Sequence, residues 1–144
     1  MSNQPVLTNR TRAWGFVQSE ANFARSRDRV TLDGSSAHLL GQSLFAGQVL
    51  AEVTATSLYV PWNPAASDGS QNAQCILGED AKNISGDPVV PVLARDAEVR
   101  VEDLTFAGTQ AALAAGLETA YANGFGRILI RILGGVQAGD PSNF

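Results

Sequence analysis

Short hydrophobic runs separated by turn-forming residues occupy the chain from residue 28 onward. Their length, and the alternation of apolar and polar positions in several of them, are typical of β-strands. We expect strands or strand-like runs at 28–32, 38–45, 48–56, 58–61, 73–77, 89–94, 97–101 and 128–133. Polar segments rich in Gly, Pro, Asp and Ser predict loops at 63–72 and 78–88. Pro91 lacks an N–H group, so its strand is expected at a sheet edge or a bulge.

One segment has a helical pattern. Residues 109–123 are rich in Ala and Leu, and Leu113, Leu117 and Tyr121 would form one apolar stripe. Thr109 is a suitable N-cap residue for this helix. Gly116 lies inside it, where glycine costs about 1 kcal/mol relative to alanine, so we expect close packing there. The fold class expected is mainly β with one helix in the C-terminal half (α+β).

The first part of the chain has no clean periodicity. Residues 1–24 are mostly polar, with isolated large apolar side chains that cannot form a core of their own. We therefore expect a flexible, extended N-terminal arm over 1–24, a single β-rich domain over 25–137 and a loose C-terminal tail over 138–144. Such an arm needs a partner surface, or packs back on its own domain.

Composition and charge exclude several classes. A chain of 144 residues with 44% hydrophobic residues is long enough for one globular domain with an ordinary core. No stretch of 18 apolar residues is present, and the N-terminus does not resemble a signal peptide, so neither a membrane nor secretion is expected. The formal net charge of −4 argues against nucleic acid as a partner. Residues 1–30 nevertheless carry five arginines and only two acidic residues. This charge is consistent with docking onto an acidic surface and equally with arginines that only solubilise a loose terminus.

Candidate catalytic residues are few. The chain has one histidine, His38, and one cysteine, Cys75, which lies in an apolar run and is expected to be a buried hydrophobe. Acidic pairs occur at Glu79–Asp80 and Glu102–Asp103, where solvated loop carboxylates are expected. Phosphate-binding glycine motifs are absent. We therefore expect no metal, no cofactor and no enzymatic activity, and the residues by themselves indicate a β-rich interaction domain with a docking arm.

Five segments in order carry a further signal: NFARSRDRVTL (22–32), the stretch 44–53 with Gly47-Gln48-Val49-Leu50, YVPWNPAASDGSQ (59–71), VVPVLARDAE (89–98) and the block 102–133. Taken in this order, they resemble the lambda-type head decoration proteins of tailed bacteriophages. Asn63-Pro64 stands where the more familiar motif has Asp-Pro, and the chain after Gly134 departs from the usual short ending.

The resemblance implies a compact, β-clip-like domain that is not an enzyme. Proteins of this family bind the major capsid protein as homotrimers on the outer surface of the expanded head, and stabilise it against internal DNA pressure. The location implied is the virion, after synthesis in the host cytoplasm. Their N-terminal arm orders on the capsid by adding a strand to it. On this basis we expect capsid-binding residues in the arm and at the start of the body: Val6, Leu7, Arg10, Arg12, Trp14, Arg25 and Arg27.

Two other classes of function stay open at this point. One is a β-rich carbohydrate- or surface-binding module, which would need exposed aromatic side chains; the chain has six Phe, two Tyr and two Trp. The other is a small hydrolase that uses Cys75 or the loop carboxylates.

Overall fold

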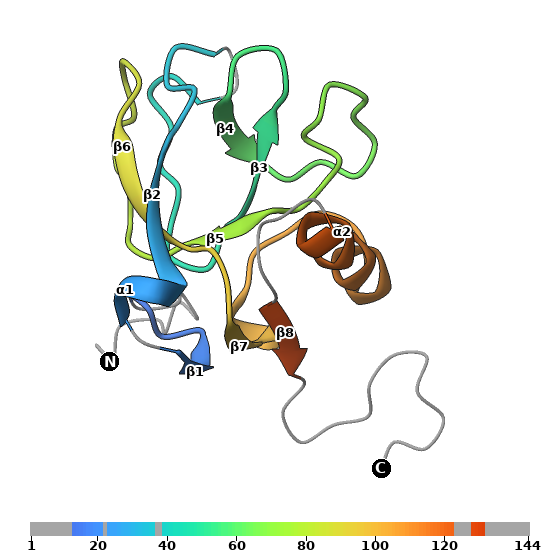
Figure 1. Cartoon of the computed structure of the whole chain (residues 1–144). Coiled ribbons are helices and arrows are strands. Elements are labelled where there is room, and N and C mark those ends of the chain that lie inside the picture. The colour runs from blue at the N-terminus through green and yellow to red at the C-terminus, as the bar shows by residue number, and fades with distance from the viewer. Residues whose placement is uncertain (1–12, 22, 37–38, 123–127, 132–144) are drawn as a thin grey trace, which may run out of the picture.

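A computed structural model describes residues 13–21, 23–36, 39–122 and 128–131. Within these residues the chain forms eight strands in two sheets, one long helix and two short helical turns (Figure 1). The elements are β1 (Val17–Glu20), α1 (Phe23–Ser26), β2 (Arg27–Thr31), β3 (Val49–Val53), β4 (Leu58–Pro61), β5 (Cys75–Leu77), β6 (Val89–Leu93), β7 (Ala97–Arg100), the 3₁₀ turn η1 (Val101–Asp103), α2 (Gln110–Ala122) and β8 (Ile128–Arg131). The fold class predicted from the sequence is confirmed.

The larger sheet has five antiparallel strands in the order β2-β6-β5-β3-β4. Its two edge strands approach each other at one end, because Leu32 forms a bridge with Tyr59 and the Asp33 N–H donates to the Tyr59 carbonyl at 2.9 Å. Figure 1 shows the result: β2 and β6 face β3 and β4 across the body, and β5 joins the two sides. The sheet is therefore curled, and β2 is an open edge only at its Arg27 end.

The smaller sheet has the order β1-β7-β8. β1 runs antiparallel to β7, with a bulge between Val17 and Ser19, whereas β8 runs parallel to β7. Parallel neighbours need a long crossover connection, and α2 lies in the segment that connects these two strands. The Ala-rich helix thus explains how the last strand returns to the same sheet.

The core consists of two clusters of buried side chains. One fills the space between the two sheets and α2, and includes Phe16, Ile76 and Leu113, all with no exposed surface. The other lies within the curled sheet and includes Leu32, Leu50 and Val92. Because successive residues of a strand point to opposite faces, β5 supplies both clusters: Ile76 joins the first, and Cys75 and Leu77 join the second.

The helix predicted at 109–123 forms at 110–122. The Thr109 hydroxyl accepts a hydrogen bond from the Ala112 N–H at 3.1 Å, which confirms Thr109 as the N-cap. Leu113 and Leu117 are buried as the stripe requires; the side chain of Tyr121 lies outside the described residues. Gly116 is buried against Ala73, so the close packing expected at this glycine is also confirmed.

Pro91 corrects one expectation, because its strand is internal. β6 pairs with β2 along its whole length, with Arg29 opposite Pro91, but pairs with β5 only at Val92 and Leu93. The Pro91 carbonyl faces the β5 side and accepts from the Gly78 N–H at 3.0 Å. The nitrogen of a strand residue points the same way as its carbonyl, so the missing N–H would face Gly78, just past the end of β5, and the Gly78 carbonyl accepts from the Trp14 N–H instead.

The boundary expected between arm and body also shifts. Phe16 is fully buried in the first core cluster, and β1 pairs with β7, so the body begins near Trp14 rather than at residue 25. The sequence interpretation missed this because Phe16 and Val17 stand among polar residues. The strand that pairs with β1 is β7, some 80 residues later. Residues 1–12 and the tail at 138–144 lie outside the described residues.

Candidate functional site

Trp14 stands where the described chain begins, and it is fixed to the body by main-chain and side-chain contacts. Its N–H donates to the Gly78 carbonyl at 2.8 Å, and its indole Nε1–H donates to Glu79 Oε2 at 3.2 Å. The ring lies 6.3 Å from that of Phe16, centroid to centroid, and packs against the first core cluster. Trp14 is therefore part of the body, although the sequence interpretation assigned it to a free arm.

Arg27, the first residue of β2, lies over the same ring. Its guanidinium carbon lies 3.7 Å from the centroid of the Trp14 ring, within the range of a cation–π contact. The guanidinium also donates to both carboxylate oxygens of Glu20, at 3.1 and 2.7 Å. Only 18% of the Arg27 side chain is exposed. This fork geometry and partial burial give Arg27 a structural role, and leave little of it accessible to a partner.

Further ion pairs join α1, β2 and the turn that precedes β7. Arg25 pairs with Asp96 at 3.0 Å, and Arg95 pairs with Asp28 at 2.8 Å. The Arg25 side chain is 68% exposed, so its contribution to stability is small and it stays available at the surface. The buried Ser26 hydroxyl accepts from the Ala21 N–H at 3.0 Å and donates to the Asp96 carbonyl at 3.2 Å, which secures the chain between β1 and β2.

Arg29, on the open edge of β2, was not among the capsid-binding residues predicted from the sequence. The Ala94 N–H donates to the Ser26 carbonyl, so even-numbered β2 residues face β6, and Arg27 and Arg29 turn their backbone groups outward. The outward N–H of Arg29 donates to Asp28 Oδ1 at 2.8 Å; this bond, together with Arg95, holds the pKa of Asp28 below its usual value. Among the described residues, the exposed Arg29 side chain has no ion-pair partner.

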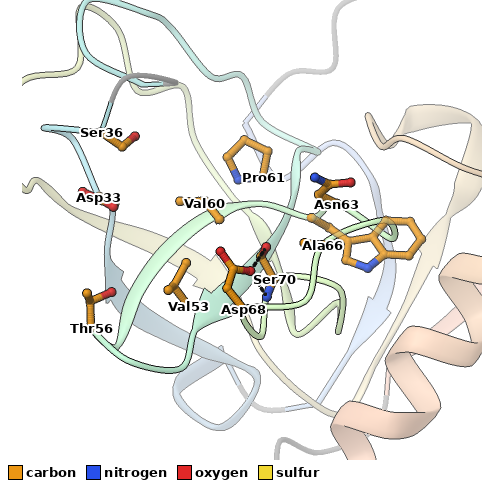
Figure 2. A pocket seen from close by; sticks show the side chains of 11 residues that line it. Asp33, Ser36, Val53, Thr56, Val60, Pro61, Asn63, Ala66, Asp68 and Ser70 are labelled. Carbon is orange, nitrogen blue, oxygen red and sulfur yellow. Dashed lines mark hydrogen bonds between the residues drawn. The ribbon is translucent and has the colours of Figure 1, made fainter.

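A groove of about 450 Å³ lies elsewhere on the body, over the β3–β4 hairpin and the 63–72 loop. Figure 2 shows Asp33 and Ser36 on one side of it and Asn63 and Ala66 on the other. Asp68 accepts hydrogen bonds from the Ser70 hydroxyl at 2.5 Å and from the Ser70 N–H at 3.0 Å, and these bonds lower the pKa of Asp68. These bonds hold the turn at Asp68 and Ser70, which forms part of the groove's lining.

This groove does not fit the carbohydrate-binding alternative. Stacking of a sugar needs an exposed aromatic face, but Trp62, which lines the groove, is only 3% exposed, and its indole Nε1–H donates to the Gln71 carbonyl at 2.7 Å. Trp14, as described above, is engaged by Arg27 and Glu79. Neither tryptophan is therefore placed as a binding platform.

The residues considered for catalysis have structural roles. Cys75 is buried in the second core cluster, and this burial raises the pKa of its thiol, which disfavours a nucleophilic thiolate. Asp80 accepts a hydrogen bond from the Ala46 N–H, and Asp103 pairs with Arg100 at 2.8 Å. His38 lies outside the described residues. Within the part of the chain that the structure describes, His, Cys, Asp and Glu form no group suited to a metal, and no helix is long and apolar enough to cross a membrane.

The predicted capsid-binding residues therefore separate into three groups. Arg25 is exposed at the surface, whereas Trp14 and Arg27 contact each other on the body. The remaining four lie outside the described residues: Val6, Leu7, Arg10 and Arg12. The sequence interpretation missed Gly78 and Glu79 as partners of Trp14, because their separation of about 65 residues leaves no local signal.

Three of the described arginines, Arg25, Arg27 and Arg29, lie in α1 and β2 of this small β-rich domain. The family model described as bacteriophage lambda head decoration protein D matches residues 6–122, and the chain belongs to this family. The match begins within the N-terminal segment and ends at the last residue of α2. A search of the curated proteins found no match. The family is one of structural proteins of the phage head, so the resemblance noted from the sequence is confirmed.

Proposed function

We propose that this protein binds the outer surface of the assembled, expanded phage head as a homotrimer and stabilises it against internal DNA pressure. The observation that carries the proposal is the family match over residues 6–122. A protein that binds only the expanded lattice stabilises that lattice by mass action, without catalysis. The partner is the major capsid protein, and synthesis takes place in the host cytoplasm. Neither nucleic acid nor membrane takes part in the binding.

The N-terminal segment, residues 1–12, supplies the main contact with the capsid. Val6 and Leu7 bury apolar surface, worth about 1.5–3 kcal/mol for each fully buried side chain, whereas Arg10 and Arg12 steer the approach and contribute contacts that salt screens. Three segments in one trimer combine weak contacts through avidity. On the body, the exposed Arg25 and Arg29 supply further basic contacts.

The test is binding of the purified full chain to expanded heads that carry no decoration protein. Cosedimentation should show saturable binding, light scattering should give the mass of a trimer for the free or the bound protein, and decorated heads should survive heating that breaks undecorated ones. Arg12→Ala should weaken binding at low salt and reduce its salt dependence, while Val6→Ala should weaken it at every salt concentration. Absence of binding to expanded heads would refute the proposal.

A further inference from the structure

Several contacts hold Trp14 on the body, which is not expected of a residue in a free arm. Trp14 has a φ of 58°, in the left-handed region that a large side chain rarely adopts. A residue keeps such a conformation only where its surroundings hold it. Here the surroundings are the Gly78 carbonyl, the Glu79 carboxylate and the Arg27 guanidinium, which itself is held by both oxygens of Glu20.

Gly78 provides an independent observation, because the space it leaves is filled by the indole. A Cβ at position 78 would lie 2.3–2.5 Å from three atoms of the Trp14 ring, a distance at which the ring must move. The backbone of Gly78 does not adopt a positive φ, so its conformation is open to any residue. The Trp14 ring, and not the local backbone, is therefore what requires glycine at this position.

We infer that Trp14 is a latch: it stays on the body and fixes the point at which the N-terminal segment, residues 1–12, is attached to the body. Arg27 and Gly78 are the positioning residues that hold it there. This inference rests on the proposed function, and it replaces the expectation that Trp14 itself is buried in the capsid. The latch places the attached end of the segment beside the Arg27 side chain of β2 and the carbonyl of Gly78, the residue that follows β5.

The statistics of a flexible chain give the smallest effect that release of the latch should have on binding to expanded heads. If Trp14 is released while Phe16 stays buried, the free segment grows by about three residues. The effective concentration of the segment at its binding site then falls by a factor of about 1.4 for each segment, or about 3 for a trimer. Loss of a fixed starting direction adds to this, so we expect binding to expanded heads to weaken about three- to tenfold.

Gly78→Ala in the full chain is the decisive variant, because it keeps Trp14 but displaces its ring. In the free protein, acrylamide quenching of tryptophan fluorescence should increase; the increase reports on Trp14, since Trp62 is only 3% exposed. Binding to expanded heads should weaken three- to tenfold. If Trp14 were instead a capsid anchor, releasing it would leave binding unchanged or make it tighter, and that result would overturn the inference.

Three further variants complete the test. In a Trp14→Ala background, Gly78→Ala should have no additional effect on binding, because the two changes remove one interaction. Arg27→Lys keeps the charge but loses the planar stack and the two-oxygen fork, so it should also increase quenching. Thr109→Ala, which weakens the α2 cap away from Trp14, controls for general destabilisation and should bind as the wild type does.

The outcomes separate the latch from the proposed function. Wild-type binding together with weakened Gly78→Ala binding supports both. Wild-type binding with unchanged Gly78→Ala binding, or with unchanged quenching in that variant, refutes the latch and leaves the decoration function standing. Failure of the wild type to bind expanded heads refutes the decoration function and the latch with it.

Discussion

Gly116 of α2 lies directly against Ala73: a Cβ at position 116 would be 3.2 Å from the Ala73 Cβ and 3.2 Å from its backbone nitrogen. This contact brings the helix against the end of the 63–72 loop, next to β5. Gly116→Val should therefore lower the free energy of unfolding by about 2 kcal/mol or more, as overpacking of a close contact typically does. Chemical denaturation measures it.

The matched control for this prediction is Ala114→Val, two residues earlier on the exposed side of α2. It introduces the same side chain without the contact to Ala73. Ala→Val costs about 0.5 kcal/mol of helix propensity, whereas Gly→Val gains a few tenths of a kcal/mol, so the propensity change favours the variant at 116. A Gly116→Val variant more stable than Ala114→Val would mean that the contact between Gly116 and Ala73 does not limit the packing.

The start of α2 gives a second prediction. Thr109→Ala removes the acceptor for the Ala112 N–H and should cost about 1 kcal/mol of stability. Thr119→Ala, in the same helix, removes a hydroxyl that donates to the Ala115 carbonyl at 3.0 Å; because alanine is the better helix former, this variant should be neutral or more stable. A helix in which both changes had the same effect would not depend on the cap.

Several elements could be predicted because their signals are local. β4 forms at 58–61 as predicted, and the N-cap and buried stripe of α2 follow from residues three or four positions apart. The position of Trp14 could not be predicted in this way. Its partners, Gly78 and Glu79, are distant in sequence, and nothing near Trp14 indicates them. For the same reason Arg27 looked like a free surface charge, although it covers the Trp14 ring.

The pairing of the strands could not be predicted from the hydrophobic pattern either. The run at 89–94 reads as an edge strand because of Pro91, yet β6 is internal. What decides this is where β5 ends, and the hydrophobic pattern predicted β5 at 73–77 rather than at the three residues Cys75–Leu77 that pair. Periodicity shows that a strand exists, but ladder length is set by contacts with the partner strands.

Asp68 gives a prediction about pH. Hydrogen bonds from the Ser70 hydroxyl and N–H lower its pKa in the folded protein, so the ionised carboxylate favours folding. This contribution is fully present above about pH 4, the ordinary range of an Asp carboxyl, and is lost as the pH falls through the lowered pKa. The wild type should therefore be more stable than Asp68→Asn at neutral pH, and the difference should shrink in acid.

Urea denaturation at a series of pH values from neutral to strongly acidic measures this difference. Glu118→Gln is the control, because the Glu118 carboxylate is exposed on α2 and accepts no hydrogen bond from the described residues. A difference between wild type and Asp68→Asn that stays constant down to the lowest pH would show that ionised Asp68 does not support the 63–72 loop.

Truncation separates the N-terminal segment from the body. Phe16 is fully buried, and β1 pairs with β7, so a protein that lacks residues 1–20 loses core packing; removal of a buried Phe alone typically costs about 3–5 kcal/mol. A protein that lacks residues 1–12 keeps Trp14, Phe16 and β1, and should melt as the wild type does. Both should lose binding to expanded heads, but only the shorter truncation attributes that loss to the segment. Phe16→Ala is the matched point variant: its melting temperature should fall as in the longer truncation, whereas equal melting of both truncations would place the start of the folded body after residue 20.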